Sequence, residues 1–464
     1  MVYIQCGTQW NKTCTSRGGA PGAGPVRTGG VCLLGGRVVS VKRLARVLKV
    51  VGFAGLFSSL ALAQVFYLAK VPNSNPNTPT AINNLGEVVV NAGSSNALSV
   101  SLWNRVAGSQ SLNVVGQNMV GSALNENGDV AGAGSETTSS QPQAFLWQSN
   151  NGTTHWLGTL GGPLSAAAGV NKSRQVVGTA YTAAGLPHAF LWTLAGGMQD
   201  LTPNLTSAGG AFATAINASG EVIGYYYPNG GSNVLGFIWT QAGGFVSFGN
   251  PGTLPFALND AGTIVGQALT ASGYRHAFSY TPAGGMVDLG TMGGSMSTAL
   301  GINNNGWIVG TSLVNDGTGV LHGFLKLPSG GLQDFISLSK LASQKQPDSV
   351  QVNDFGDIAF STKNLLTVLM PNVSETTVSS ANPSKAGQAV TLTVTLSSIA
   401  GPPPDGEQLL VDLNGVQVGS GTIKNGVAKC QVTGLKTGTR TLTVIYNGDA
   451  YYFPFRYAFK QVVQ

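Results

Sequence analysis

A sevenfold pattern of apolar and polar positions runs through the middle of the chain. Each copy places an apolar residue before an asparagine, then two variable residues, usually a glycine, one further residue and an apolar pair. The asparagines are Asn83, Asn125, Asn171, Asn217, Asn259, Asn303 and Asn353, which are 42, 46, 46, 42, 44 and 50 residues apart. A period of about 44 residues predicts a repeat architecture, in which we interpret the asparagines as structural repeat residues.

Each Asn-x-x-Gly segment predicts a hairpin. Asparagine is favoured at the first position of a type I turn and glycine at the fourth, and the asparagine side chain can bond to the backbone two residues on. A third strand follows a variable loop, as in Phe190-Leu191-Trp192, and a fourth follows a glycine-rich turn, as in Met198–Leu201. Four short antiparallel strands in about 44 residues are typical of one propeller blade.

The two ends of the repeat region predict a closed ring. The seventh copy stops after its third strand near Pro371, while a lone apolar segment, Val65–Leu68, precedes the first asparagine turn. If that segment completes the seventh blade, no sheet edge is left exposed. We therefore expect a seven-bladed β-propeller over residues 64–371. The alternative is an open stack of sheets with capped ends.

Several motif blocks recur in order through this region. Examples are His188-Ala189-Phe190-Leu191-Trp192, Asp288-Leu289-Gly290-Thr291-Met292-Gly293-Gly294 and Gly301-Ile302-Asn303. Together they resemble the bacterial extracellular HAF repeat family, although the first and seventh copies lack the His-Ala-Phe core. The resemblance implies export or surface display, and it implies no established reaction.

Residues 372–464 break the period. Strict alternation in Val390–Leu396 and Thr441–Tyr446 predicts strands with one face on a core, and Asn414-Gly415 and Asn425-Gly426 are hairpin dipeptides. About seven strands in this length predict an Ig-like β-sandwich, so the whole chain is expected to be all-β. The segment Tyr446–Asp449 resembles a block of bacterial Ig-like repeats found in surface proteins.

The basic charge of the chain belongs to its first 63 residues, which hold eight Lys and Arg residues and no acidic residue. The rest holds 16 of the 24 basic residues and all 18 acidic ones, a net charge of −2. A protein of this charge has no overall attraction for phosphate, so we expect no nucleic-acid partner.

The leader predicts a signal peptide. Basic residues between Lys42 and Lys49 precede the uncharged apolar stretch Val50–Leu60, and Ala61–Ala63 is a small-x-small cleavage site. We expect cleavage after Ala63, a secreted or cell-surface protein and no stable membrane span afterwards. An uncleaved anchor is the alternative. Residues 1–37 lie upstream of a normal signal peptide, and we interpret them as a mis-assigned start.

Repeat-equivalent polar residues are interpreted as structural, because an active site occurs once whereas a scaffold feature occurs in every blade. This applies to His188, His276, His322, Asp200, Asp288 and Asp334. The repeated aromatics Trp103, Trp147, Trp192, Trp239 and Tyr280 are expected to pack between blades. The strings Asn303–Asn305 and Asp354–Asp357 lack the carboxylate density of a calcium loop. We expect no metal site, cofactor or catalytic residues, and we interpret Cys430 as a small buried hydrophobe.

Residues that depart from the repeat are better ligand candidates. They are His155, Trp156, Tyr225, Tyr226, Tyr227 and Trp307. We predict an exported, non-catalytic binding or structural protein whose propeller presents a surface to an unknown glycan or protein, with the Ig-like domain as a spacer. A scaffold in a periplasmic complex is a further interpretation.

The alternative function is a secreted propeller enzyme that acts on polysaccharide. It needs two carboxylates about 5–10 Å apart in a funnel. Unrepeated carboxylates at one mouth of the channel favour this alternative, whereas a mouth lined only by Ser, Thr, Gly and Asn argues against it.

Overall fold

The computed structural model describes residues 31–34, 37–40, 66–71 and 81–464, except 95–96, 138–140, 207–208, 229–232, 316, 318, 336–346, 363–364, 449–451 and 453. Residues 1–58 and 59–464 form two compact units. In the first unit, β1 (Val31–Leu34) and β2 (Arg37–Ser40) pair as an antiparallel hairpin. The expected signal peptide and its cleavage site after Ala63 lie outside the described residues. Within the described part of the chain, no helix has the length and apolarity needed to cross a membrane.

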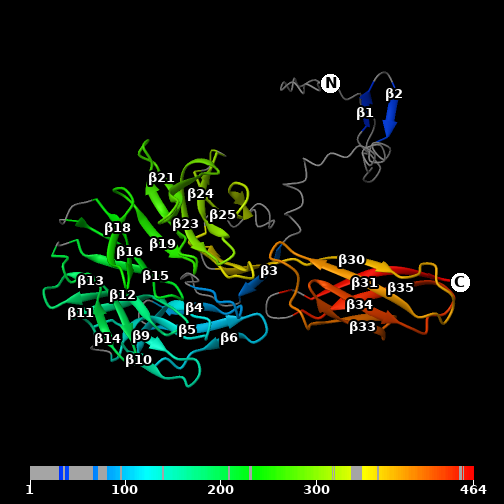
Figure 1. Cartoon of the computed structure of the whole chain (residues 1–464), viewed down its shortest axis with the longest axis horizontal. Coiled ribbons are helices and arrows are strands. Elements are labelled where there is room, and N and C mark those ends of the chain that lie inside the picture. Colours follow the sequence, from blue (N-terminus) through cyan, green and yellow to red (C-terminus); the bar gives the residue numbers. More distant parts are fainter. Residues whose placement is uncertain are drawn as a thin grey trace, which may run out of the picture. The chain divides into compact units, whose positions relative to one another are not determined.

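Seven small antiparallel sheets follow the repeat and form the blades of a propeller (Figure 1). The strands of blades 1 to 3 are β4 (Val88–Ser94), β5 (Ala97–Asn104) and β6 (Gly108–Ser111); β7 (Gln117–Leu124), β8 (Val130–Ser135), β9 (Gln143–Trp147) and β10 (Thr154–Trp156); and β11 (Gly161–Val170), β12 (Val176–Thr182), β13 (Pro187–Thr193) and β14 (Gly197–Asp200).

The strands of blades 4 to 7 follow the same order. They are β15 (Ala211–Ile216), β16 (Val222–Tyr226), β17 (Leu235–Thr240) and β18 (Gly244–Phe248); β19 (Leu254–Leu258), β20 (Ile264–Leu269), β21 (Arg275–Thr281) and β22 (Gly285–Gly290); β23 (Gly293–Ile302), β24 (Ile308–Val314), β25 (Leu321–Lys326) and β26 (Gln333–Asp334); and β27 (Ser349–Val352), β28 (Ile358–Thr362) and β29 (Leu365–Pro371), to which β3 (Phe66–Val71) is added.

The expected closing strand is confirmed. β3 pairs antiparallel with β29, from Val71 opposite Leu366 to Phe66 opposite Pro371. The seventh blade therefore combines three strands from the end of the repeat region with one strand from its start. Because this pairing covers the edge of β29, the ring is closed and the alternative of an open stack is wrong.

In blades 2 to 7 the asparagine turn joins the first two strands, as the sequence predicted, whereas in blade 1 the Asn83 turn precedes β4 and is flanked by an isolated bridge between Ile82 and Val88. In blade 1 the amide of Gly86 donates to the carbonyl of Asn83 at 3.1 Å, and Gly86 has a φ of 68°. This is a type I turn closed by a left-handed residue, a conformation that glycine adopts at no steric cost. In blade 3 Arg174 takes the glycine position with a φ of 60°, a conformation that is strained for a residue with a side chain.

Apolar side chains between neighbouring blades form the core. Trp103, Trp147, Trp192 and Trp239 are at most 9% exposed, and Trp192 packs with Leu146 of the preceding blade. The expected inter-blade packing of these aromatics is therefore confirmed. Each buried ring contributes a few kcal/mol through removal of apolar surface from water.

The C-terminal strands form one seven-stranded antiparallel sheet in the order β30-β31-β34-β33-β32-β35-β36. The strands are β30 (Ser374–Ser379), β31 (Val390–Ser397), β32 (Gln408–Leu413), β33 (Val416–Lys424), β34 (Val427–Val432), β35 (Gly438–Tyr446) and β36 (Phe455–Val463). A bridge between Ser384 and Val463 brings the sheet close to full closure.

The predicted details of this domain agree with the structure. Asn414 and Asn425 have φ angles of 53° and 50°, and each is followed by a glycine with positive φ, as a type I′ hairpin requires. Cys430 is 0% exposed on β34, and burial raises the pKa of its thiol to about 11. It behaves as the buried hydrophobe that its sequence position predicted.

Candidate ligand-binding mouth of the propeller channel

The seven repeat asparagines form a closed ring of hydrogen bonds around the propeller axis, which we call the asparagine ring. The side-chain Nδ2 of each member donates to the main-chain carbonyl of the next asparagine, at 2.8–3.3 Å. The Oδ1 of each accepts the backbone amide four residues on, at 2.8–3.0 Å. All seven are 1–6% exposed. Their side-chain amides are thus committed to joining the blades.

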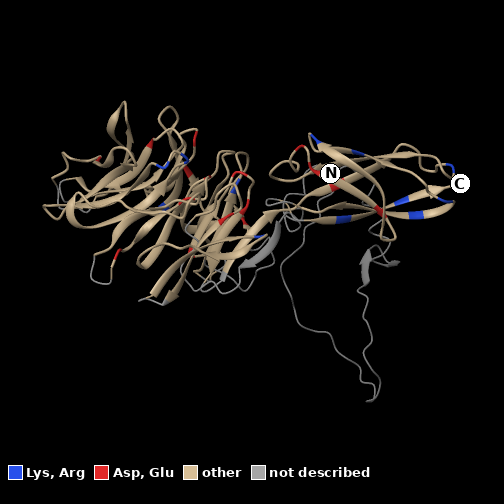
Figure 2. Cartoon of the chain, turned by 90° about the horizontal axis from the view of Figure 1, so that it is seen from below, with Lys and Arg blue, Asp and Glu red and all other residues tan. Residues whose placement is uncertain are grey.

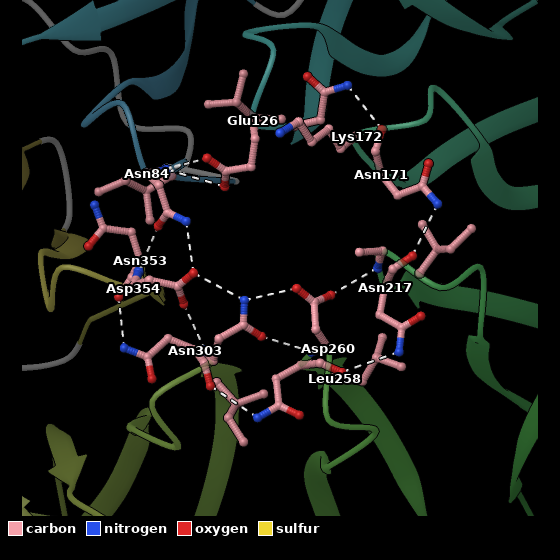
Figure 3. Close-up of a pocket in the computed structure, with 18 of the residues that line it drawn as sticks. Asn84, Glu126, Asn171, Lys172, Asn217, Leu258, Asp260, Asn303, Asn353 and Asp354 are labelled. Atoms are coloured by element: carbon pink, nitrogen blue, oxygen red, sulfur yellow. Dashed lines mark hydrogen bonds between the residues drawn. The ribbon is translucent and has the colours of Figure 1, made fainter.

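The residue after each asparagine lies at the tip of the turn and lines a cavity at this end of the channel. These mouth residues are Asn84, Glu126, Lys172, Ala218, Asp260, Asn304 and Asp354. The cavity has a volume of about 380 Å³, and Figure 3 shows the side chains arranged around an open centre. The seven turns therefore converge on one site although they are far apart in sequence.

Most of the mouth positions are linked by a second chain of hydrogen bonds. The backbone amide at each position donates to the side chain of the next, from Ala218 to Asp260 (2.9 Å), Asp260 to Asn304 (2.8 Å), Asn304 to Asp354 (2.7 Å), Asp354 to Asn84 (2.7 Å) and Asn84 to Glu126 (3.0 Å). Among the described residues this chain has no counterpart between Glu126 and Lys172 or between Lys172 and Ala218. The second ring is therefore open at Lys172.

The wall of the cavity next to the asparagine ring is apolar. The residue before each asparagine lines it, and these residues, the apolar collar, are Ile82, Leu124, Val170, Ile216, Leu258, Ile302 and Val352. The cavity is therefore amphipathic, since the mouth residues are mostly polar and the collar residues are apolar. Such a cavity suits a small ligand with charged groups on an apolar body, because ligand pockets combine an apolar lining with a few polar groups that orient the ligand.

The mouth is acidic. The mouth residues include three carboxylates (Glu126, Asp260 and Asp354) and one amine (Lys172), so they carry a net charge of −2 when all four groups are ionised. Partial desolvation by the surrounding turns raises the pKa of the Glu126 carboxyl; the charges of Asp354 and Asp260 add to this, while the amide of Asn84 and the amine of Lys172 oppose it. Charged residues are otherwise sparse, as Figure 2 shows for the strands of both domains.

A second hollow adjoins the mouth. This side pocket, of about 490 Å³, is lined by Asn127, Ser149, Asn150, Lys172, Ser173 and Arg174. Lys172 lines both the side pocket and the channel cavity, so the two hollows adjoin at that residue. The side pocket has two basic residues and no carboxylate among its lining residues, in contrast to the mouth, although Arg174 is paired with the buried carboxylate of Asp129.

Arg174 also joins two blades. Its Nε and Nη2 atoms lie 2.8 and 3.3 Å from the carboxylate of Asp129, which is 0% exposed. Burial alone would raise the pKa of Asp129, but hydrogen bonds from Arg174, Asn125 and the Ser149 amide outweigh it and lower the pKa. This ion pair offsets the strained backbone of Arg174.

The ligand candidates His155 and Trp156 lie on β10, the outermost strand of blade 2. The His155 ring is 6.3 Å from that of Trp192, whereas the Trp156 ring is 6.2 Å from Phe145. Both candidates are half-buried, and the structure does not bring them to the channel cavity.

The three tyrosine candidates point to two faces of blade 4. Tyr225 and Tyr227 lie with Phe212 in a half-exposed aromatic cluster, with ring centroids 5.1–6.3 Å apart. Burial raises the pKa of Tyr225, with a smaller contribution from Tyr227. Tyr226 points to the other face, where its ring contacts Phe245 and its hydroxyl donates to Ser247 at 3.1 Å. The role of these residues in binding stays a prediction.

Trp307 is 5% exposed and packs with Val309, Leu325 and Phe335. Its ring therefore offers little surface to a ligand. The repeated histidines pair with the repeated aspartates, as in His188 Nδ1 and Asp200 at 2.8 Å, and these pairs join the third and fourth strands. Equivalent pairs are His276 with Asp288 and His322 with Asp334.

None of the mouth residues is among the ligand candidates predicted from sequence. The signal that could have found them is the position after each asparagine, where seven copies carry five residue types beside an unvarying neighbour. Glu126, Asp260 and Asp354 meet the condition that favours the enzyme alternative, since they are unrepeated carboxylates at one mouth. No group of three or more His, Cys, Asp or Glu residues within the described ranges is placed to hold a metal ion.

Comparison with protein families identifies the C-terminal domain. Residues 376–458 match the bacterial Ig-like domain (group 3), in agreement with the seven-stranded C-terminal sheet. No curated protein matches the sequence significantly.

Several solved structures resemble this chain at low identity. A streptogramin B lyase structure is 15% identical, with 66% of this chain and 98% of that chain covered and a TM-score of 0.42. TolB from Acinetobacter baumannii is 11% identical, with 69% and 92% covered and a TM-score of 0.36. A structure of prolyl endopeptidases is 11% identical, with 79% and 62% covered and a TM-score of 0.43. At these values none of them assigns an activity to this chain.

Proposed function

We propose that the protein is an exported, non-catalytic binding protein that holds a small polar ligand at the asparagine-ring mouth of its propeller channel. The observation that carries this proposal is the contrast between two adjacent positions. The asparagine is the same in all seven turns, and its side chain makes the hydrogen bonds that join the blades. The next residue varies from turn to turn and lines the cavity. The side chain at this position is not fixed by the repeat, and carboxylates that accept one backbone amide keep further acceptor sites for a ligand.

Export is supported by two features. The leader combines basic residues with an apolar stretch and a small-x-small site, and the C-terminal domain matches a bacterial Ig-like family. In this proposal the Ig-like domain acts as a spacer or attachment unit for the propeller. Expression of the full chain in a bacterial host, followed by N-terminal sequencing of the exported protein, should give Gln64 as the first residue.

The ligand site is tested by screening the protein from residue 64 onward. A thermal-shift screen of small charged metabolites and a glycan array would identify a ligand. The double variant Glu126→Gln/Asp354→Asn changes two mouth residues, and Glu407→Gln/Asp405→Asn makes the same changes in the Ig-like domain. Weakened binding in the first variant and unchanged binding in the second supports the proposal. Equal binding by both variants contradicts a site at the mouth.

A secreted enzyme acting on polysaccharide is the second candidate. Glu126 favours it, because a carboxyl with a raised pKa can serve as a general acid, and the Asp354 carboxyl lines the same cavity. Against it, Asp260 and Asp354 already accept backbone amides at 2.9 and 2.7 Å, which holds them in structural contacts. Release of new reducing ends from a polysaccharide panel, abolished in Glu126→Gln, would support the enzyme and contradict the non-catalytic proposal.

A further inference from the structure

We propose that the channel mouth and the side pocket form one site for a small dipolar ligand, with an ammonium group at one end and a carboxylate at the other. The inference rests on the proposed binding function and specifies its ligand class. Its basis is the position of Lys172, which lines two adjoining cavities whose lining residues differ in charge: three carboxylates line the channel cavity, and none lines the side pocket.

The acidic half of the site holds the ammonium group. Glu126, Asp260 and Asp354 line the channel cavity; burial raises the pKa of the Glu126 carboxyl, and the charges of Asp354 and Asp260 add to this. A cation bound among these like charges is favourable, because an opposite charge nearby stabilises ionised carboxylates. An ammonium group supplies three donors to such a set of acceptors.

The basic half of the site holds the carboxylate. Lys172 is exposed, and its amine makes no hydrogen bond among the described residues. Ser149, Asn150 and Ser173 line the same pocket and can add neutral hydrogen bonds. Arg174 also lines the pocket, although two of its nitrogen atoms are engaged by the Asp129 carboxylate, which balances its charge.

The second chain of hydrogen bonds is interrupted at Lys172, the residue shared by the acidic half and the basic half of the site. From Ala218 round to Glu126 the mouth residues are tied to one another, but the Lys172 side chain takes no part. That side chain can therefore turn toward a ligand without breaking a hydrogen bond of the second chain. A ligand that extends from the channel cavity over Lys172 reaches a hollow of comparable size, about 490 Å³ beside about 380 Å³.

The apolar collar indicates that the part of the ligand between its two charged ends is a hydrocarbon chain. Its aliphatic side chains line the same cavity as the acidic groups, so an unbranched hydrocarbon chain next to the ammonium group can contact apolar surface there. The ω-amino acids, which carry an amine and a carboxylate at the two ends of a methylene chain, have this form. They provide a set of probes that differ only in the separation of the charges.

Isothermal titration calorimetry of the protein from residue 64 onward, with ω-amino acids from 3-aminopropanoate to 8-aminooctanoate, tests the inference. One chain length should bind about tenfold tighter than both the alkylamine and the alkyl carboxylate of the same length, because each lacks one charge-assisted contact. Equal affinity for the amine and the amino acid would overturn the dipolar ligand.

Two single variants assign the ends. Lys172→Met should reduce the affinity for the amino acid to that for the alkylamine, and Glu126→Gln should weaken the amine and the amino acid by the same factor. Lys424→Met and Glu407→Gln, in the Ig-like domain, are the matched controls and should leave binding unchanged. Loss of binding in a control, or no loss in Lys172→Met, would contradict the inference.

The failure of this inference is distinguishable from the failure of the proposed function. If none of the amino acids binds but another ligand is lost in Glu126→Gln/Asp354→Asn, the dipolar ligand is wrong and the binding mouth stands. If that variant binds every identified ligand normally, both are wrong.

Discussion

The side-chain amide of Asn353 donates a hydrogen bond to the main-chain carbonyl of Asn83, 270 residues away, at 3.1 Å. Asn83 in turn donates to Asn125, and the same contact passes through every blade until it returns to Asn353. The first and last blades are therefore joined by this bond, while the pairing of β3 with β29 closes the seventh blade. Closure by two separate sets of hydrogen bonds leaves neither end of the repeat as an exposed edge.

Asn217 tests the contribution of one member of the asparagine ring. Its Oδ1 accepts the amide of Glu221 at 3.0 Å, and its Nδ2 donates to the carbonyl of Asn259 at 3.3 Å. Asn217→Ala leaves these buried groups unpaired, so we expect the free energy of unfolding to fall by about 3 kcal/mol. Urea denaturation followed by tryptophan fluorescence measures the change, and an unchanged midpoint would contradict a structural role for the ring.

Asn217→Asp separates the two functions of that side chain. The carboxylate can still accept the Glu221 amide, but it opposes the carbonyl of Asn259 and the nearby Glu221 carboxylate. The introduced aspartate should therefore have a raised pKa in the folded state. Its destabilising effect is present above the pKa of the unfolded chain, about 3.9, and should disappear as the pH falls below it. A destabilisation independent of pH would contradict the donor role.

Arg174→Gly restores the residue that the other six turns carry. At neutral pH we expect a loss of about 1–2 kcal/mol, because buried Asp129 loses its cationic partner and the relief of backbone strain offsets this only in part. The pKa of Asp129 is lowered, so the stability it contributes is present above about pH 3.9 and is lost as the pH falls through its folded pKa. At such low pH the variant should be at least as stable as the parent.

The control for this prediction is Arg174→Gly/Asp129→Asn, which removes the unpaired charge. Urea denaturation from about pH 2.5 to 7 should show a smaller pH dependence for the double variant than for the parent. A stability gain in Arg174→Gly at neutral pH would mean that strain exceeds the ion pair, contrary to our expectation.

Glu126→Gln should not destabilise the protein at neutral pH. The raised pKa of Glu126 means that its proton is held more tightly in the folded state, so its contribution is most favourable below the unfolded pKa of about 4.3 and is lost as the pH rises through the folded pKa. The glutamine side chain does not titrate and lacks that loss, so the variant should gain slightly on the parent at neutral pH. Thermal unfolding against Glu407→Gln measures this, and a lower midpoint in Glu126→Gln would contradict the prediction.

Removal of residues 64–71 from the protein that begins at Gln64 tests closure. The variant lacks β3, so the backbone groups of β29 lose their partners and form an exposed edge. We expect a lower unfolding midpoint and concentration-dependent association, measured by thermal unfolding and size-exclusion chromatography with light scattering. A monomer with the unfolding midpoint of the parent would show that β3 does not stabilise the ring.

The local structure of this protein was predictable from sequence. The positions of the turns followed from Asn-x-x-Gly, the strands from the apolar segments around it, and the closing strand from the incomplete seventh copy. Each of these rests on interactions between residues near one another in sequence or on counting strands per repeat. The inter-blade packing of Trp192 and its equivalents followed from the same periodicity.

The mouth was decided only by the tertiary structure. Glu126, Asp260 and Asp354 occupy a turn position that varies from copy to copy, so a search for recurring motif blocks within the chain passes over them. Their proximity arises because seven turns 42 to 50 residues apart are rotated about one axis until their tips converge. The period of the repeat predicts that such an axis exists. Contacts between blades determine which side chains meet beside the axis and where the second chain of hydrogen bonds is interrupted, and no local sequence pattern predicts those contacts.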